Sequence, residues 1–152
     1  RQFHPRVNEF REQSPYGWSG RTHGDASRWA DFLREEVVAG RRNLIFDTTM
    51  SNGPWTVELI NDLKAKGYTV EVRAIVAPKL QSELGVDARF ADAVDAQGFG
   101  RCVAQAPQDA IFAKFPRSLD TVRAQTDAPI RLFDRDGREL YDSRTDSRLP
   151  SF

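Results

Sequence analysis

The sequence predicts an α/β fold built around parallel strands. Two segments with the composition of buried strands, residues 43–47 and 68–77, flank a segment with helical periodicity, residues 52–67. A strand, a helix and a strand within about thirty residues form a βαβ unit, in which the strands run parallel and the crossover is right-handed. Further along the chain, residues 128–144 have the pattern of two short strands about Asp136-Gly137, a dipeptide typical of hairpin turns.

Composition restricts the class of protein. The chain has 152 residues, of which 39% are hydrophobic and 29% charged, so one domain with a sizeable core is expected. Its 22 basic and 22 acidic residues cancel, which argues against a general binder of nucleic acid or of anionic membranes. A single cysteine, Cys102, excludes an internal disulfide and a cysteine metal cluster. No long apolar segment and no secretory signal are visible, so a cytoplasmic protein is expected.

The N-terminal part of the chain contains one clear helical pattern. Residues 1–24 include three glycines and two prolines without a clear period, and an irregular segment is expected there. Residues 25–40 have the spacing of an amphipathic helix, which Asp25 can cap and Gly40 can end. Because the chain starts at Arg1 without a methionine, either the start has been removed or the sequence belongs to a longer polypeptide.

Glycine and proline punctuate the rest of the chain. Pro54 suits the first turn of helix 52–67, and Gly67 suits its C-terminal cap. Residues 78–105 are helical in pattern but interrupted by several glycines, and a helix over 107–127 is expected to break near Pro116. Residues 145–152 are predicted to form a C-terminal tail.

A carboxylate and hydroxyls stand where the strand 43–47 ends. Ligands of open α/β sheets bind at the carboxyl ends of strands, and Asp47 and Thr49 occupy that position. Two interpretations stay open. Thr49, Ser51 or Asn52 caps the next helix and Asp47 is a turn residue, or Asp47 and Thr49 hydrogen-bond a hydroxylated or phosphorylated ligand.

Two arginines, Arg89 and Arg101, lie in the glycine-interrupted segment. A guanidinium group pairs bidentately with phosphate, so two arginines on a mobile lid could close over a transferring phosphoryl group. The alternative is that both are ordinary surface residues. The chain has no Gly-x-x-x-x-Gly-Lys-Ser/Thr motif, and no metal site is expected from His4 and His23, which are poorly spaced for metal ligation.

Five motifs in order resemble the zeta toxins. They are Arg1-Gln2-Phe3-His4-Pro5, helix 25–40, "NLIFDTTM", "LKAKGYTVEV", and Arg89-Phe90 followed by Gly100-Arg101. Zeta toxins are P-loop kinases of bacterial toxin–antitoxin systems that phosphorylate UDP-N-acetylglucosamine. The resemblance implies a three-layer, P-loop-kinase-like parallel sheet flanked by helices, with a C-terminal β-hairpin, in a kinase domain over residues 1–144. It also implies ATP and Mg²⁺ as cofactors and an antitoxin as a partner.

The resemblance assigns roles by position. Arg1 and His4-Pro5 are similar to the end of a family element whose aspartate takes a proton from the sugar hydroxyl, so the resemblance implies a substrate-binding role for Arg1. Asp31 and Asp47 stand at positions where the family has glutamates that hold the sugar nucleotide, and Thr49 matches a threonine there.

On the donor side, Arg89 and Arg101 match the two family arginines that embrace the ATP phosphates. Ser51 replaces an arginine of one well-known family pattern, so the resemblance implies that this contact is lost.

The family's phosphate loop and catalytic aspartate would precede Arg1. They belong to the same polypeptide, come from a separate chain, or are absent from a rebuilt fold. Two other functions therefore stay open beside the kinase: a non-catalytic module that binds a sugar nucleotide or an antitoxin, and a related kinase with another acceptor, such as a nicotinamide nucleotide.

Overall fold

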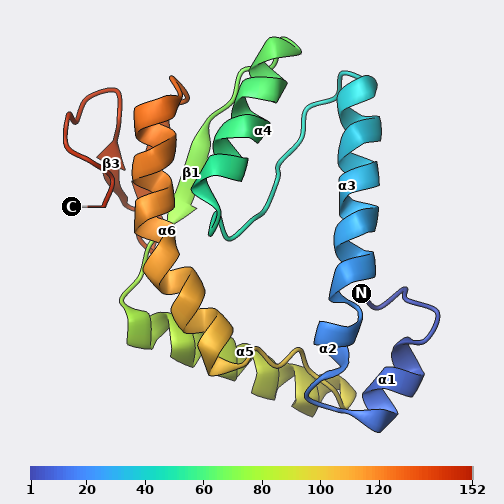
Figure 1. Ribbon diagram of the computed structural model, residues 1–152. Helices are drawn as coiled ribbons and strands as arrows, with labels where there is room; N and C mark the ends of the chain where they lie inside the picture. The colour runs from blue at the N-terminus through green and yellow to red at the C-terminus, as the bar shows by residue number, and fades with distance from the viewer. Residues whose placement is uncertain (152) are drawn as a thin grey trace. The chain divides into compact units, whose positions relative to one another are not determined.

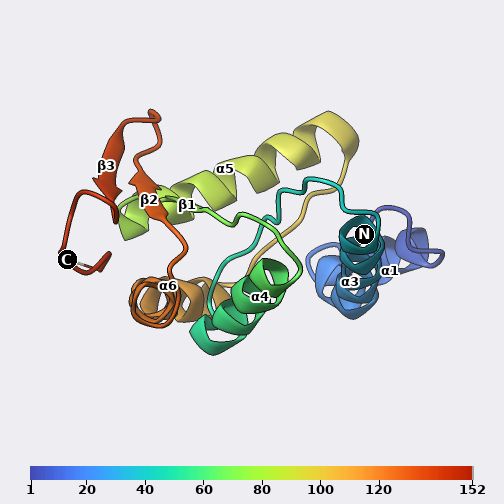
Figure 2. The same ribbon diagram turned by 90° about the horizontal axis from the view of Figure 1, so that it is seen from above.

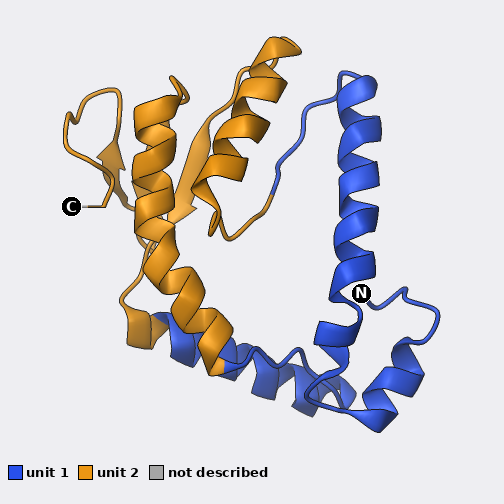
Figure 3. Ribbon diagram, in the orientation of Figure 1, with its two compact units in different colours: residues 1–46, 82–104 blue, residues 47–81, 105–152 orange. Residues whose placement is uncertain are grey.

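The computed structural model describes residues 1–151 and has a mixed α/β architecture (Figures 1 and 2). It contains two compact units, which are coloured separately in Figure 3. The first unit consists of Arg1–Phe46 and Ser82–Ala104, and the second of Asp47–Gln81 and Gln105–Phe152. The mixed α/β class predicted from the sequence is confirmed, and each unit is described separately.

The first unit begins with two short helices instead of the irregular segment that was predicted. These are α1 (Val7–Gln13) and α2 (Trp18–Arg21), and they are followed by the long helix α3 (His23–Ala39). Trp18 is buried, and its indole anchors α2. The helix predicted over residues 25–40 is confirmed as α3, and Gly40 follows its last residue. The capping role predicted for Asp25 is wrong, because the helix begins earlier, at His23 after Thr22, and Asp25 lies inside its first turn.

The strand predicted over residues 43–47 is wrong. These residues belong to no strand, and the side chain of Ile45 is 99% exposed. A strand is stable only when a neighbouring strand takes up its backbone hydrogen bonds. The described residues supply no such neighbour for 43–47, so apolar composition alone does not make a strand there.

The second unit holds a three-stranded sheet in the order β1 (Val72–Ile75), β2 (Ile130–Phe133) and β3 (Glu139–Asp142). β1 pairs with β2 in parallel, with Val72 opposite Ile130, and β2 pairs with β3 antiparallel. The C-terminal hairpin is therefore confirmed. The parallel partner of β1 is β2, however, and not the segment 43–47, so the βαβ unit predicted over 43–77 is not formed.

Two helices cover one face of this sheet, α4 (Gly53–Ala65) and α6 (Gln105–Gln125) (Figure 2). The core between the helices and the sheet is apolar and includes Ile60 of α4, Leu119 and Val122 of α6, and Ile130 of β2. Burying these side chains is the main source of stability that holds α4 and α6 on the sheet.

The glycine and proline residues predicted at the ends of α4 lie where they were expected, whereas the interruptions predicted inside α5 and α6 do not occur. Pro54 lies in the first turn of α4, and Gly67, at a positive φ of 87°, follows its C-terminus. α5 (Lys79–Gln97) continues through Gly85 and ends before Gly98. The break predicted near Pro116 does not occur. α6 continues past this proline and only changes direction along its length (Figure 1).

Candidate functional site

Arg1 is held by two contacts within the first unit. Its Nη1 donates a hydrogen bond of 2.7 Å to the carbonyl oxygen of Ser19, and its Nη2 lies 2.5 Å from Nδ1 of His23. Burial lowers the pKa of Arg1, and repulsion by Arg101 lowers that pKa further. The two guanidinium groups are therefore close enough to interact, although they lie a hundred residues apart in sequence.

The segment that carries Arg101 is fixed by contacts on both sides of it. Nε1 of the buried Trp18 donates to the carbonyl oxygen of Gly100 at 2.9 Å, and Oγ of Ser19 donates to the carbonyl oxygen of Cys102 at 3.4 Å. The residues before and after Arg101 are thus tied to α2, and the backbone of Arg101 is held in place.

Gly100 also passes very close to α5. A Cβ atom at this position would lie 2.6 Å from the carbonyl oxygen of Phe90, a distance that side chains essentially never reach. Phe90 follows Arg89 along α5, so this approach places Arg89 and Arg101 on adjacent segments of the first unit. Only glycine permits the approach.

Both of these arginines are available to a ligand. Arg89 and Arg101 are exposed, and neither side chain forms a hydrogen bond or an ion pair with any described residue. Most other arginines in the chain do have a partner, such as Arg144 on Asp142. Arg1 and Arg101 repel each other, and an anionic ligand would relieve that repulsion.

The N-terminal segment is fixed to α3 through His4. Nδ1 of His4 accepts from the backbone N–H of Arg6 at 3.1 Å, so Nε2 carries the proton of the neutral ring and donates to Oδ2 of Asp25 at 3.0 Å. The His4 ring also lies against the rings of Phe10 and Trp29. This attachment positions Arg1, three residues upstream.

Asp31 lies on α3 and forms an ion pair. Its Oδ1 accepts from Nη1 of Arg34 at 2.7 Å, and its side chain is half-exposed. The guanidinium of Arg34 also lies over the ring of Phe46, 5.5 Å from its centroid. The carboxylate of Asp31 is therefore accessible, and its orientation is set by Arg34.

Asp47 and Thr49 belong to the second unit, in the segment that leads into α4. Asp47 is exposed and has no hydrogen-bonding partner among the described residues, while Oγ1 of Thr49 donates to Oγ of Ser51 at 3.3 Å. Between them and α4, Met50 adopts a positive φ of 47° with its side chain in the core, an uncommon conformation for this residue type.

The helix cap is Asn52, one of the three candidates. Its Oδ1 accepts from the backbone N–H of Trp55 at 3.2 Å. Thr49 and Asp47 are therefore not used for capping and stay available to a ligand. Grouping them in one site with the first unit's residues stays a prediction.

The comparisons with known proteins now identify the family. A family model described as "Zeta toxin" matches residues 1–146. The chain belongs to the zeta toxin family. This confirms the resemblance seen in the five ordered motifs.

Two relatives of this zeta toxin family chain are informative. It is 27% identical over 103 residues to "Toxin zeta" of Streptococcus pyogenes, which covers 66% of this chain and 36% of the relative. It also resembles a chain solved in a study of the PezAT chromosomal toxin–antitoxin system of Streptococcus pneumoniae, with a TM-score of 0.81 and 19% identity over 97% of this chain. The chain spans 59% of that structure, and the likeness shows the fold.

In this zeta toxin family chain, sequence reasoning missed Trp18 and Ser19, which fix the segment around Arg101, and it assigned Asp25 to helix capping instead of to the contact with His4. Each acts on a residue far along the chain, as when Trp18 bonds to Gly100. No local pattern signals such contacts. Within residues 1–151, no helix is long and apolar enough to cross a membrane.

Proposed function

We propose that this chain forms the acceptor-binding and phosphate-contacting part of a kinase that transfers a phosphoryl group from ATP to a hydroxyl of a sugar nucleotide such as UDP-N-acetylglucosamine. The observation that carries the proposal is the pair Arg89 and Arg101. Both are exposed, neither has a partner among the described residues, and they lie on adjacent segments fixed by the contact of Gly100 with Phe90.

The chemistry of phosphoryl transfer suits this arrangement. Catalysis of that reaction depends on positioning and on stabilising negative charge, with little covalent chemistry for the protein to perform. In the proposal, Arg89 and Arg101 bind the phosphate oxygens of ATP, whose charge Mg²⁺ also offsets. Arg1 lies within the field of Arg101 and adds a third positive charge.

The phosphate loop is not among these 152 residues, and the proposal requires it from another segment or chain. The sheet of the second unit supports this requirement. β1 is an edge strand, and Ile75 on it is 71% exposed. A strand that carries the phosphate loop and pairs with β1 would extend the parallel sheet into the three-layer form of P-loop kinases.

On the acceptor side, Asp31, Asp47 and Thr49 would hold the sugar nucleotide. Carboxylates accept hydrogen bonds from sugar hydroxyls, and a threonine hydroxyl both donates and accepts. Asp31 and Asp47 are shorter by one methylene than the family's glutamates. The acceptor would therefore sit deeper or be a related molecule, such as a nicotinamide nucleotide.

Formation of ADP by the full-length protein with ATP, Mg²⁺ and UDP-N-acetylglucosamine tests the proposal. Arg101→Ala and Arg89→Ala should each lower kcat by about a hundredfold or more. Arg135→Ala is the control, because Arg135 lies exposed in the turn between β2 and β3. Unchanged rates in both Arg89 and Arg101 variants would refute the roles assigned to these residues.

A second candidate is a binding module without catalysis, favoured by Asp31 and Asp47, which are one methylene shorter than the family's glutamates. It would bind a sugar nucleotide or an antitoxin, and the structural relative was solved in a study of a toxin–antitoxin system. Calorimetry separates the two functions. The kinase binds both ATP and the sugar nucleotide, whereas the module binds the sugar nucleotide or antitoxin and not ATP.

A further inference from the structure

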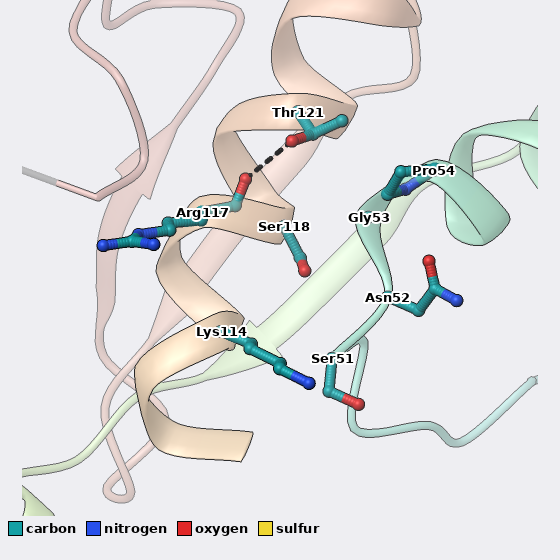
Figure 4. A pocket seen from close by; sticks show the side chains of 8 residues that line it. All are labelled: Ser51, Asn52, Gly53, Pro54, Lys114, Arg117, Ser118 and Thr121. Atoms are coloured by element: carbon teal, nitrogen blue, oxygen red, sulfur yellow. Dashed lines mark hydrogen bonds between the residues drawn. The ribbon is translucent and has the colours of Figure 1, made fainter. Parts of the chain in front are cut away.

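The second unit contains a pocket that the proposed kinase reaction does not use. It has a volume of about 530 Å³ and lies between the N-terminus of α4 and the middle of α6 (Figure 4). No carboxylate lines it. Its lining residues are Ser51, Asn52, Gly53, Pro54, Lys114, Arg117, Ser118 and Thr121.

One backbone donor at the start of α4 has no acceptor. Of the first-turn N–H groups, that of Trp55 bonds to the side chain of Asn52, that of Thr56 bonds to the carbonyl oxygen of Asn52, and Pro54 has none. The N–H of Gly53 has no partner among the described residues. The positive end of the dipole of α4 lies at the same N-terminus and also favours an anion there.

The hydroxyl of a largely buried serine gives independent support for a ligand. Ser118 on α6 is only 5% exposed, and its Oγ forms no hydrogen bond with any described residue. Figure 4 shows this hydroxyl directed into the pocket, between Lys114 and Gly53. Oγ of Ser118 is not among the fully buried atoms without a partner, so it is reached from the open pocket and is placed to bond to something that occupies the pocket.

α4 and α6 approach each other unusually closely here. A Cβ atom on Gly53 would lie 3.1 Å from Cα of Ser118 and 3.1 Å from Cβ of Thr121. The free N–H of Gly53 and the free hydroxyl of Ser118 therefore belong to backbone segments in contact. Thr121 does not compete for the ligand, because its Oγ1 donates to the carbonyl oxygen of Arg117 at 2.8 Å.

One positive charge, that of Lys114, faces the N–H of Gly53 and the hydroxyl of Ser118. In Figure 4, the side chain of Lys114 extends toward Ser51 across the pocket, whereas the guanidinium of Arg117 extends away from it. Lys114 forms no ion pair with any described residue. A lysine ammonium, a free backbone N–H and a free hydroxyl are all donors, and the pocket offers no negative charge to oppose an anion.

We infer that this pocket binds a phosphate-type oxyanion through Lys114, the N–H of Gly53 and the hydroxyl of Ser118. The donors of this pocket all belong to the second unit, whereas Arg89 and Arg101 belong to the first. Its ligand is either free inorganic phosphate or the phosphate group of a small metabolite, because the donors recognise the oxygens that both share. The inference stands or falls independently of the kinase proposal.

The backbone amide of Gly53 gives a direct readout. Asn52-Gly53 is the single Asn-Gly pair in this sequence, so labelling asparagine with ¹³C at the carbonyl and glycine with ¹⁵N selects its amide signal. Inorganic phosphate and, in a second arm, glucose 1-phosphate are titrated into the full-length protein. A saturable downfield shift of the Gly53 amide proton is expected with at least one probe, and the tighter probe identifies the source.

Variants on α6 supply the controls. Lys114→Gln should weaken binding by about tenfold and Ser118→Ala by about fivefold, because each removes one donor. Arg117→Gln, on the same helix but directed away, should change the dissociation constant less than about twofold. No shift of the Gly53 amide with either probe would overturn the inference, as would equal binding by Lys114→Gln and the unmodified protein.

Discussion

The indole Nε1 of Trp18 donates a hydrogen bond of 2.9 Å to the carbonyl oxygen of Gly100, and this bond holds the residue that precedes Arg101. The ring of Trp18 also packs edge-on against Phe99, at 6.1 Å between centroids. A buried aromatic side chain on α2 thereby fixes a segment more than eighty residues away, from which one of the proposed phosphate-binding arginines projects.

Trp18→Phe tests this relationship. Phenylalanine keeps most of the ring packing but leaves the carbonyl of Gly100 without its donor, which should cost about 1–3 kcal/mol of unfolding free energy. Because Arg101 is then less well positioned, kcat should fall by about tenfold. Urea denaturation and a steady-state assay measure the two effects.

Trp29→Phe is the matched control. Trp29 is 46% exposed on α3, so its substitution should change stability by less than about 0.5 kcal/mol. Equal losses of stability in the two variants would show that the bond to Gly100 has no special role.

Replacement by alanine should have opposite effects on protein stability at Gly53 and at Gly24. Gly53→Ala brings a Cβ to 3.1 Å from α6 and should destabilise the protein by about 1–3 kcal/mol. Gly24→Ala, in helix α3 where the new Cβ meets nothing within 4 Å, should stabilise it by about 0.4–1 kcal/mol. Thermal unfolding measures both, and a stable Gly53→Ala protein would contradict the close packing of α4 on α6.

The hydrogen bond between His4 and Asp25 should protect the amide hydrogens of the N-terminal segment from exchange with solvent. His4→Phe keeps an aromatic ring beside Phe10 but removes both hydrogen bonds of the imidazole. Residues 1–13 should then exchange their amide hydrogens faster, as hydrogen–deuterium exchange can measure. Arg28→Gln removes the other partner of Asp25 and should leave this exchange unchanged. Faster exchange in both variants alike would contradict the role of His4.

Asp142 predicts a pH-dependent contribution to stability. The side chain and backbone N–H of Arg144 bond to its carboxylate and lower its pKa from 3.8 to about 2. A lowered pKa in the folded state stabilises the protein above the unfolded value, and this stabilisation is lost as pH falls through the folded value. Asp142→Asn should therefore be less stable than the unmodified protein at pH 7, and the difference should shrink between pH 3.8 and about 2.

The control for this effect is Asp136→Asn. The carboxylate of Asp136 is exposed in the hairpin turn, and none of the described residues bonds to it. Its substitution should change stability little at pH 7. A difference for Asp142→Asn that stays constant with pH would contradict the bond to Arg144.

Local signals in the sequence were sufficient for the ends of α4, for the C-terminus of α3 and for the hairpin. Asn52, Pro54 and Gly67 act through backbone groups a few residues away, so their roles at the ends of α4 follow from residue type. The Asp136-Gly137 turn is equally local, and Gly137 adopts the positive φ of 82° that such a turn requires.

Strand partners and the contacts that position the site could not be read from the sequence. Residues 43–47 have the composition of a strand, but strand formation depends on a neighbour that no described residue supplies. α6 continues through Pro116 because the packing of Leu119 and Val122 holds the helix. The ordered motifs identified Arg89 and Arg101 as candidates, whereas the close approach of Gly100 to Phe90 that places them on adjacent segments appears only in the structure.

Mass spectrometry of the sugar nucleotide tests the central claim most directly. UDP-N-acetylglucosamine is incubated with the full-length protein, ATP and Mg²⁺, and the mass of the sugar nucleotide is measured. The kinase proposal predicts a gain of one phosphoryl group, which Arg101→Ala should largely abolish. A sugar nucleotide of unchanged mass, bound by the protein while ATP is neither bound nor consumed, would contradict the kinase proposal and favour the binding module.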